Sequence, residues 1–182
     1  MEIEQEMVQV RKARITDLPA IVEIYNQGVE DGIATCDLSD FTPDERYGWF
    51  NDHQGRYPLW VAEYANAVIG WTTLSPYDVK ACFSLTAMFS TYVHREARGR
   101  GVGTILRRHL IEEARKLGFH TIVNRVFAVN ERSIALAKKF GFTQVGHMRE
   151  IVYRDGQFID CVFFQMLLEP AGDAKESSAN DK

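Results

Sequence analysis

Residues 98–103 read Arg-Gly-Arg-Gly-Val-Gly, and they lie between a strand-like run that ends at Val93 and an amphipathic run that begins at Thr104. Three glycines in six residues allow a sharp turn and bring backbone N–H groups close to a ligand. A turn at a helix start adds the positive end of the helix dipole, which favours a phosphate group. The two arginines can also pair with phosphate oxygens. The stretch therefore predicts a binding loop for a phosphate-bearing molecule.

The residues around this loop predict a strand–helix–strand unit. Strands are expected over residues 84–93 and 119–129, with an amphipathic helix over residues 104–117 between them. Asn130 then caps a second helix. A crossover of this length favours parallel strands, and ligands bind beyond the carboxyl ends of such strands. Because the glycine loop and Asn130 both fall at those ends, we expect them to share a site.

The rest of the chain is rich in predicted strands. The stretch Arg154-Asp155-Gly156-Gln157 is typical of a hairpin turn. Further strands are expected over residues 8–13, 59–64, 68–74, 145–153 and 158–167, and further helices begin near residues 16 and 42. We expect one domain over residues 1–169 and a disordered tail over residues 170–182, which are small, polar and charged.

Composition narrows the class of protein. The net charge of −4 argues against a general nucleic-acid binder, and no apolar run reaches the roughly 18 residues of a membrane span. The acidic N-terminus lacks the pattern of a secretory signal. Three cysteines far apart predict reduced thiols in a cytoplasmic protein, and the histidines show no spacing that predicts a metal site.

Other glycine motifs fit the loop less well. A dinucleotide fingerprint needs G-x-G-x-x-G, whereas the third glycine here, Gly103, comes one residue early. The Gly-Lys-Ser/Thr of a nucleotide P-loop is absent, and an RNA-binding Arg-Gly tract would be repeated. A structural turn without a ligand is the alternative, although a single glycine would suffice for a turn and the two arginines would not be needed.

Two motifs carry a resemblance to a known family. Arg98-x-x-Gly101-x-Gly103, before an amphipathic helix, resembles the acetyl-CoA-binding motif of the GNAT N-acetyltransferases. Asn130-x-x-Ser133-x-x-Leu136 resembles the next motif of that family. The likeness extends over about residues 8–168 to the phosphinothricin and methionine-sulfoximine acetyltransferase branch. It implies an α/β domain with a mixed, mostly antiparallel sheet that splays near its centre and has helices on both faces.

The resemblance also implies how acetyl-CoA is bound. The main-chain N–H groups of the loop hold the pyrophosphate, the end of the preceding strand pairs with the pantetheine arm, and Asn130 reaches the same arm. A plain helix cap is the alternative role of Asn130, and the two roles are compatible. The implied binding residues are Tyr92, Val93, His94, Arg98, Gly99, Arg100, Gly101, Val102, Gly103, Asn130 and Ser133.

The half of the site that would bind the acceptor departs from the branch. Met88 stands where the branch has a glutamate, and Ala137 stands where it has a histidine and the wider family a tyrosine. Asp78 and Ser84 occupy positions where arginines are expected. The acceptor is therefore not expected to be phosphinothricin itself.

Two side chains remain as catalytic candidates. Tyr92 is a candidate acid, on the strand face that it shares with Met88 and Ser90, with a structural tyrosine as the alternative. Glu30 is a candidate proton relay or amine-binding group, with a solvated carboxylate as the alternative. Direct attack by the amine needs only that a fraction of it be neutral when held against the thioester.

The sequence therefore predicts acetyl transfer from acetyl-CoA to the primary amine of a small molecule, such as an amino acid or an analogue. We expect direct transfer in a ternary complex, without a metal, a nucleic acid or a membrane. A non-catalytic acetyl-CoA-binding or sensing module and a protein N-acetyltransferase are the alternatives. The resemblance also implies a homodimer.

Overall fold

The computed structural model describes residues 3–168, so the tail predicted over residues 170–182 lies outside the described residues. Within residues 3–168, seven strands and four helices follow one another, with short 3₁₀ turns among their connections. The strands are β1 Gln9–Lys12, β2 Leu59–Tyr64, β3 Ala67–Pro76, β4 Thr86–Val93, β5 Thr121–Phe127, β6 Thr143–Arg154 and β7 Gln157–Leu167. The helices are α1 Leu18–Asp31, α2 Pro43–Asp52, α3 Val102–Lys116 and α4 Glu131–Lys139.

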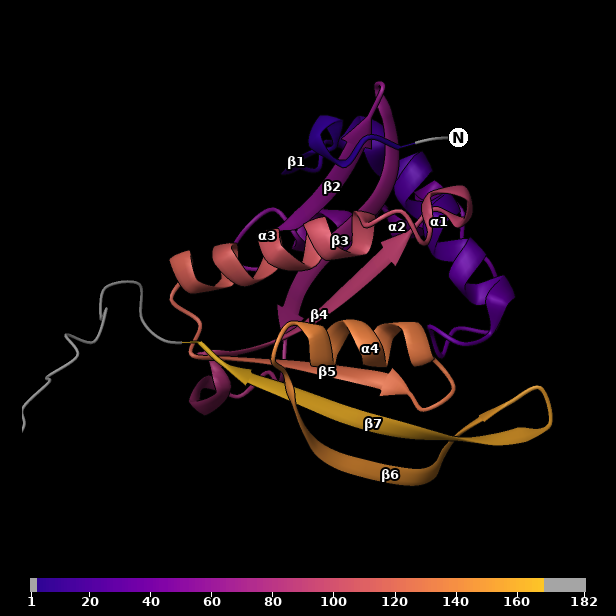
Figure 1. The fold of residues 1–182 in the computed structure, drawn as a ribbon, viewed down its shortest axis with the longest axis vertical. Coiled ribbons are helices and arrows are strands. Elements are labelled where there is room, and N and C mark those ends of the chain that lie inside the picture. Colours follow the sequence, from indigo (N-terminus) through magenta and orange to yellow (C-terminus); the bar gives the residue numbers. More distant parts are fainter. Residues whose placement is uncertain (1–2, 169–182) are drawn as a thin grey trace, which may run out of the picture.

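The strands form one sheet in the order β1-β2-β3-β4-β5-β7-β6 (Figure 1). Every neighbouring pair is antiparallel except β4 and β5, which are parallel. The register of that pair runs only from Thr86 opposite Thr121 to Met88 opposite Val123. Beyond Met88 the two strands diverge, so the predicted splayed, mostly antiparallel sheet is confirmed.

Helices cover both faces of the sheet, as predicted. Ile21 of α1 and Phe50 of α2 pack with Trp71 of β3 on one face. Leu110 of α3 and Ala137 of α4 pack with the other face. Figure 1 shows α3 and α4 in front of the sheet, with α1 and α2 on its far side. The site must therefore lie where the strands part between these layers.

The residues between β6 and β7 explain that hairpin, and the turns at the end of β5 and the start of α3 explain why these boundaries differ from the predicted ones. Asp155 and Gly156 both have a positive φ, of 50° and 79°, as a two-residue hairpin turn requires. β5 ends at Phe127 rather than at residue 129 because the Asn130 N–H turns back to the Phe127 carbonyl. α3 begins at Val102, two residues earlier than predicted, directly after the left-handed Gly101.

Candidate active site

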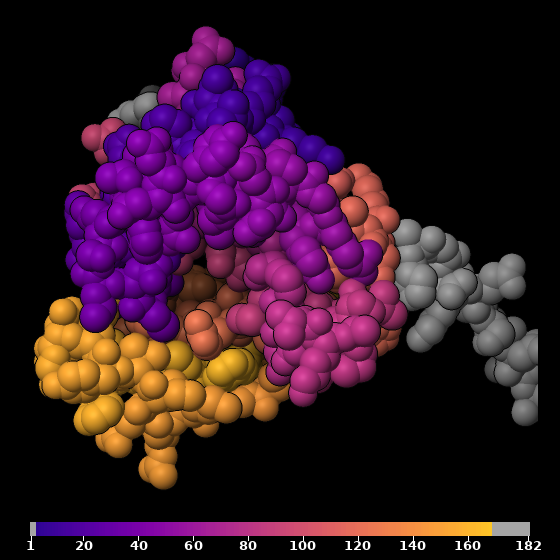
Figure 2. Space-filling model, turned by 180° about the vertical axis from the view of Figure 1, so that it is seen from behind, coloured from indigo at the N-terminus to yellow at the C-terminus, as the bar shows by residue number. Residues whose placement is uncertain are grey.

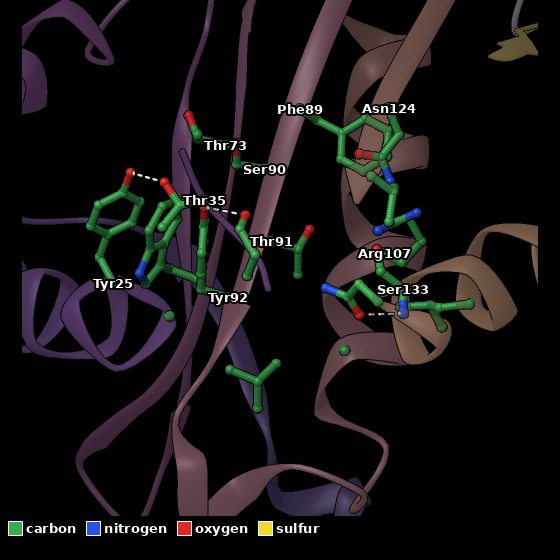
Figure 3. Close-up of a pocket in the computed structure, with 18 of the residues that line it drawn as sticks. Tyr25, Thr35, Thr73, Phe89, Ser90, Thr91, Tyr92, Arg107, Asn124 and Ser133 are labelled. Atoms are coloured by element: carbon green, nitrogen blue, oxygen red, sulfur yellow. Dashed lines mark hydrogen bonds between the residues drawn. The ribbon is translucent and has the colours of Figure 1, made fainter. Parts of the chain in front are cut away.

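A cleft of about 1230 Å³ lies where β4 and β5 diverge. Its walls come from the end of β4, the glycine loop, the first turn of α3, α4, and the loop that follows α1 (Figure 3). Figure 2 shows a hollow on the face opposite α3, bordered by the purple, magenta and yellow-orange parts of the chain. Because β4 and β5 diverge, they leave a space between the helices that cover the two faces of the sheet.

The glycine loop forms a cradle of unpaired donors at the start of α3. Gly99 and Gly101 have φ values of 77° and 86°, a conformation that side chains with a Cβ rarely adopt. Both glycines and Gly103 line the cleft. Within residues 3–168, no group accepts a hydrogen bond from the main-chain N–H groups of residues 99–103. Unpaired N–H groups at the positive end of a helix fit a phosphate ligand.

Arg98 holds this loop against α1. Its Nε donates to the Val93 carbonyl at 3.0 Å, and its Nη1 donates to the Asp31 carboxylate. Arg95 donates to Asp31 at 3.0 Å as well. Burial acts against ionisation of Asp31, but these hydrogen bonds from Arg98 and Arg95 lower its pKa. The Arg98 guanidinium is therefore engaged within the protein and positions the loop.

Three of the predicted binding residues do not line the cleft. They are His94, Arg100 and Val102. The His94 ring lies 3.6 Å from the Glu23 carboxylate of α1, and Val102 is buried beneath the loop. The predicted contribution of all three included the main chain, but Arg100 was also predicted to add charge from its side chain, and the structure does not place Arg100 in the lining of the cleft.

Glu30 lies outside the cleft. Its carboxylate accepts from Arg95 at 2.7 Å, and about half of its side chain is exposed. The neighbouring Asp31 lines the cleft instead, because adjacent positions on α1 face different directions. The structure thus does not bring Glu30 to the diverging strands.

Tyr92 lines the cleft with its ring packed on aromatic neighbours. The ring centroids lie 4.7 Å from Trp71 and 5.0 Å from Tyr25. Its hydroxyl donates to the Ala34 carbonyl at 3.2 Å, and burial raises the pKa of Tyr92 above its ordinary value. The hydroxyl therefore keeps its proton near neutral pH and directs it to the loop after α1.

That loop, residues 33–37, crosses the parting of the strands. Asn130 donates to the Ile33 carbonyl at 3.1 Å, and its Oδ1 accepts from the Ser133 N–H at 3.1 Å. The predicted helix cap is confirmed by this second bond. The buried Arg154 donates to the carbonyls of Thr35 at 3.2 Å and Asp37 at 2.6 Å. Tyr92 donates to Ala34 of the same loop, so residues from β4, β6 and the start of α4 all hold residues 33–37. We call residues 33–37 the strap.

The side of the cleft covered by α1 and α2 is aromatic. Tyr25, Trp49 and Trp71 line it together with Arg46, whose guanidinium lies 4.6 Å from the Tyr25 ring centroid. His53 lines the same side, and burial lowers the pKa of its imidazole. Sequence reasoning missed these groups because aromatic residues at helical spacing are typical of a core.

The four altered positions lie in different environments: the cleft, the core and the surface. Met88 lines the cleft, whereas Ala137 is fully buried in α4. Asp78 and Ser84 are exposed and do not line it.

Arg107 is a further cleft residue that the sequence reasoning missed. Its side chain is buried at 2% exposure, and it lines the cleft from α3. A usable signal was present, since Arg107 shares the apolar helix face of Leu110, Ile111 and Ala114.

Metal and membrane features are absent from the described residues. In residues 3–168, no group of three or more His, Cys, Asp and Glu side chains is placed to hold a metal ion. None of the helices over that range is long and apolar enough to span a membrane.

Comparison with known proteins agrees with this geometry. The model of the acetyltransferase (GNAT) family matches residues 19–142. The L-methionine sulfoximine/L-methionine sulfone acetyltransferase of Pseudomonas aeruginosa is 33% identical over 168 residues, 91% of this chain and 97% of that protein. The crystal structure of an N-acetyltransferase from Staphylococcus aureus Mu50 has a TM-score of 0.87 and 32% identity, covering 89% of this chain and 99% of that one.

A relative solved with its donor supports the cofactor. The GNAT superfamily phosphinothricin acetyltransferase from Sinorhizobium meliloti, in complex with acetyl-CoA, has a TM-score of 0.86 at 29% identity, covering 94% of this chain and 95% of that one. The unpaired N–H groups of the glycine loop fit the pyrophosphate of this ligand. This chain therefore belongs to the acetyltransferase (GNAT) family and is an acetyl-CoA-dependent N-acetyltransferase.

Proposed function

We propose that the protein acetylates the primary amine of a small molecule, an amino acid or an analogue, by direct transfer in a ternary complex. One observation carries this proposal: a single cleft is lined both by the glycine-loop cradle and by the aromatic side chains of Tyr25, Trp49 and Trp71. The face opposite α3 is hollowed (Figure 2). A donor and an acceptor can therefore occupy the cleft together, and no carrier group is needed between them.

On the donor side, the N–H groups of residues 99–103 would hold the pyrophosphate. The end of β4 at Tyr92 and Val93, with the following His94, would pair with the amides of the pantetheine arm, because β5 has left β4 by that point. Asn130, on the opposite wall, would exchange its bond to Ile33 for the arm or keep it as part of the strap.

On the acceptor side, the lining suits an amino acid with an apolar side chain. Tyr25, Trp49 and Trp71 offer apolar area, and Arg46 and Arg125 offer positive charge for a carboxylate. The relative from Pseudomonas aeruginosa is named for methionine sulfoximine and methionine sulfone, which supports this class. The absence of a carboxylate at Met88 leaves the amine to lose its proton to water.

Cys36 offers a sharp test of direct transfer, since it is an exposed free thiol that lines the cleft. Direct transfer predicts that Cys36→Ser keeps its kcat within about twofold and that initial rates follow a sequential pattern. An acetyl group trapped on Cys36, or ping-pong kinetics, would contradict this proposal.

The substrate class is tested by thiol release from acetyl-CoA over a panel of amines. We expect turnover with free amino acids or their analogues, with higher kcat/KM for apolar side chains. Turnover with peptides alone would favour a protein N-acetyltransferase. Binding of acetyl-CoA with no turnover on any acceptor would favour a sensing module.

We also propose a homodimer in the cytoplasm. β6 lies at the edge of the sheet and exposes Val145, Met148, Ile151 and Tyr153, which supports an apolar interface. The free thiols support a reducing compartment. Light scattering should give twice the mass of one chain, and Ile151→Lys should halve it. Cell fractionation tests the compartment.

A further inference from the structure

Arg107 presents a buried positive charge without a partner. Its Nε and Nη1 atoms are buried, and within residues 3–168 no group accepts a hydrogen bond from them. No carboxylate of the described chain forms an ion pair with it. Burial lowers the pKa of Arg107 to about 9, so it still carries its charge near neutral pH. A buried charge in this state destabilises a fold unless something else meets it.

The Arg107 guanidinium packs on aromatic rings, and the residue lines the cleft. Its Cζ lies 4.3 Å from the ring centroid of Phe89 and 5.5 Å from that of Phe142. These ring faces attract the cation but accept no strong hydrogen bond. Figure 3 shows Arg107 on the same side of the cleft as Phe89 and Asn124. Within residues 3–168 these N–H donors have no acceptor, and a ligand in the cleft, which Arg107 lines, would supply one.

The position of Arg107 along the cleft indicates which part of a ligand it meets. The register of β4 and β5 ends at Met88 and Val123, so Phe89 and Asn124 are the first residues past the point of parting. Phe89 lies three residues before Tyr92, roughly 10 Å deeper along the strand. An arm that enters over the glycine loop and follows β4 inward would bring its far end to this depth.

We propose that Arg107 stabilises the negative charge that forms on the thioester end of acetyl-CoA during transfer. This inference rests on the proposed acetyl transfer to an amine. In that step the nitrogen lone pair forms the C–N bond, and the C–S bond breaks with its electron pair on sulfur. The nitrogen proton passes to water, and the coenzyme leaves as a thiolate, which later takes a proton from water. Arg107 would donate hydrogen bonds to the carbonyl oxygen and then to the sulfur.

The geometry favours this role over recognition of the acceptor. Arg107 and Phe89 lie on the α3 side of the sheet, whereas Tyr25, Trp49 and Trp71 line the side of α1 and α2.

Three variants test the proposal. Arg107→Met removes the charge and keeps much of the volume, and Arg107→Lys keeps a cation with a different reach. Arg108→Met is the matched control, because Arg108 is the next residue of α3 and is exposed. We expect Arg107→Met to lower kcat by about 10²–10³ while the KM for the acceptor changes less than threefold. Arg107→Lys should recover part of the loss, and Arg108→Met should match the wild type.

Two readouts without turnover separate this role from a structural one. First, the midpoint of denaturation of Arg107→Met should equal or exceed that of the wild type, because a buried charge without a partner is removed. Second, bound coenzyme A should show more thiolate absorbance on the wild type than on Arg107→Met, measured near the ordinary thiol pKa of about 8.5.

The outcomes that overturn the proposal are distinct. A less stable Arg107→Met with normal kcat would make Arg107 structural. A raised KM for the acceptor with normal kcat would make it an acceptor-binding residue. Wild-type protein that binds coenzyme A but acetylates no amine would instead contradict the proposed function, and the thiolate measurement would still report on Arg107.

Discussion

Gly101 shows how a single residue shapes the donor site. Its φ of 86° precedes α3, and a Cβ at this position would lie 2.5 Å from Nε2 of Gln5. The left-handed conformation costs an L-residue about 1–2 kcal/mol, and the contact would displace the Gln5 side chain or the loop. Glycine at position 101 therefore keeps the N–H groups of the loop in place.

Replacement of Gly101 by alanine should weaken acetyl-CoA binding by about tenfold or more, as measured by calorimetry, because the loop must shift to relieve the strain. Gly48→Ala is the matched control, since Gly48 lies in α2 with no atom within 4 Å of an added Cβ. That variant should bind normally and gain about 0.5–1 kcal/mol of stability. Normal binding by Gly101→Ala would argue against the cradle.

Asp31 gives the loop a dependence on pH. Because Arg98 and Arg95 lower its pKa, Asp31 stabilises the fold above its ordinary pKa of 3.8, and this stability is lost as the pH falls below that value. Asp31→Asn should therefore cost about 1–2 kcal/mol at neutral pH, measured by urea denaturation. The difference from the wild type should shrink below about pH 4. A difference that is constant with pH would exclude the ion pair as its cause.

At this scale, the sequence predicts what depends on neighbours along the chain. The glycine loop and the Asn130 cap are patterns of residues close together in the chain, so the sequence alone predicts both. The partners of Arg98 and the isolation of Arg107 depend on residues brought together from α1, β4 and α3. No spacing encodes those contacts, so the role of Arg98 in holding the loop emerges only from the fold, whereas a solvated carboxylate was already the alternative for Glu30.

Among the elements, the strap of residues 33–37 connects the two halves of the splayed sheet. Tyr92, Asn130 and Arg154 each donate to its carbonyl oxygens, from β4, from the start of α4 and from β6. The bonds to Ile33 and Ala34 are exposed, whereas Thr35 is buried and its carbonyl needs a donor because leaving it unpaired costs free energy. The strap thus links the two halves of the sheet and borders the acceptor side of the cleft.

Asn130→Asp separates the two roles of Asn130. An aspartate still caps α4 by accepting from the Ser133 N–H, but it cannot donate to the Ile33 carbonyl. We expect faster amide hydrogen exchange in residues 33–37 and a raised KM for the acceptor, with unchanged exchange in α4. Unchanged exchange in the strap would show that this bond does not hold it.

Most elements could be predicted from periodicity and turn residues, and their boundaries shifted by about two residues. The strap could not, because its order comes from donors far away in sequence. Its own sequence, with Gly32, Ser39 and Asp40 around it, is typical of an ordinary loop. Tertiary hydrogen bonds therefore turn an unremarkable connection into part of the site.

In the whole molecule, the active site follows from where the sheet stops being continuous. β4 and β5 share a register of only three residues, and residues at the starts of α3 and α4 line the cleft that opens beyond it. A parallel pair that parts in this way exposes main-chain groups in a covered interior, which a ligand with amides and phosphates can satisfy. The family resemblance predicts this splay, whereas periodicity alone predicts only neighbouring strands.

The structure of the protein with coenzyme A bound tests this account most directly. The account predicts the pyrophosphate against the N–H groups of residues 99–103, the pantetheine arm along Tyr92, Val93 and His94, and the sulfur at the end of the cleft beside Arg107. A pyrophosphate bound away from residues 99–103, or an arm that does not enter between β4 and β5, would contradict it.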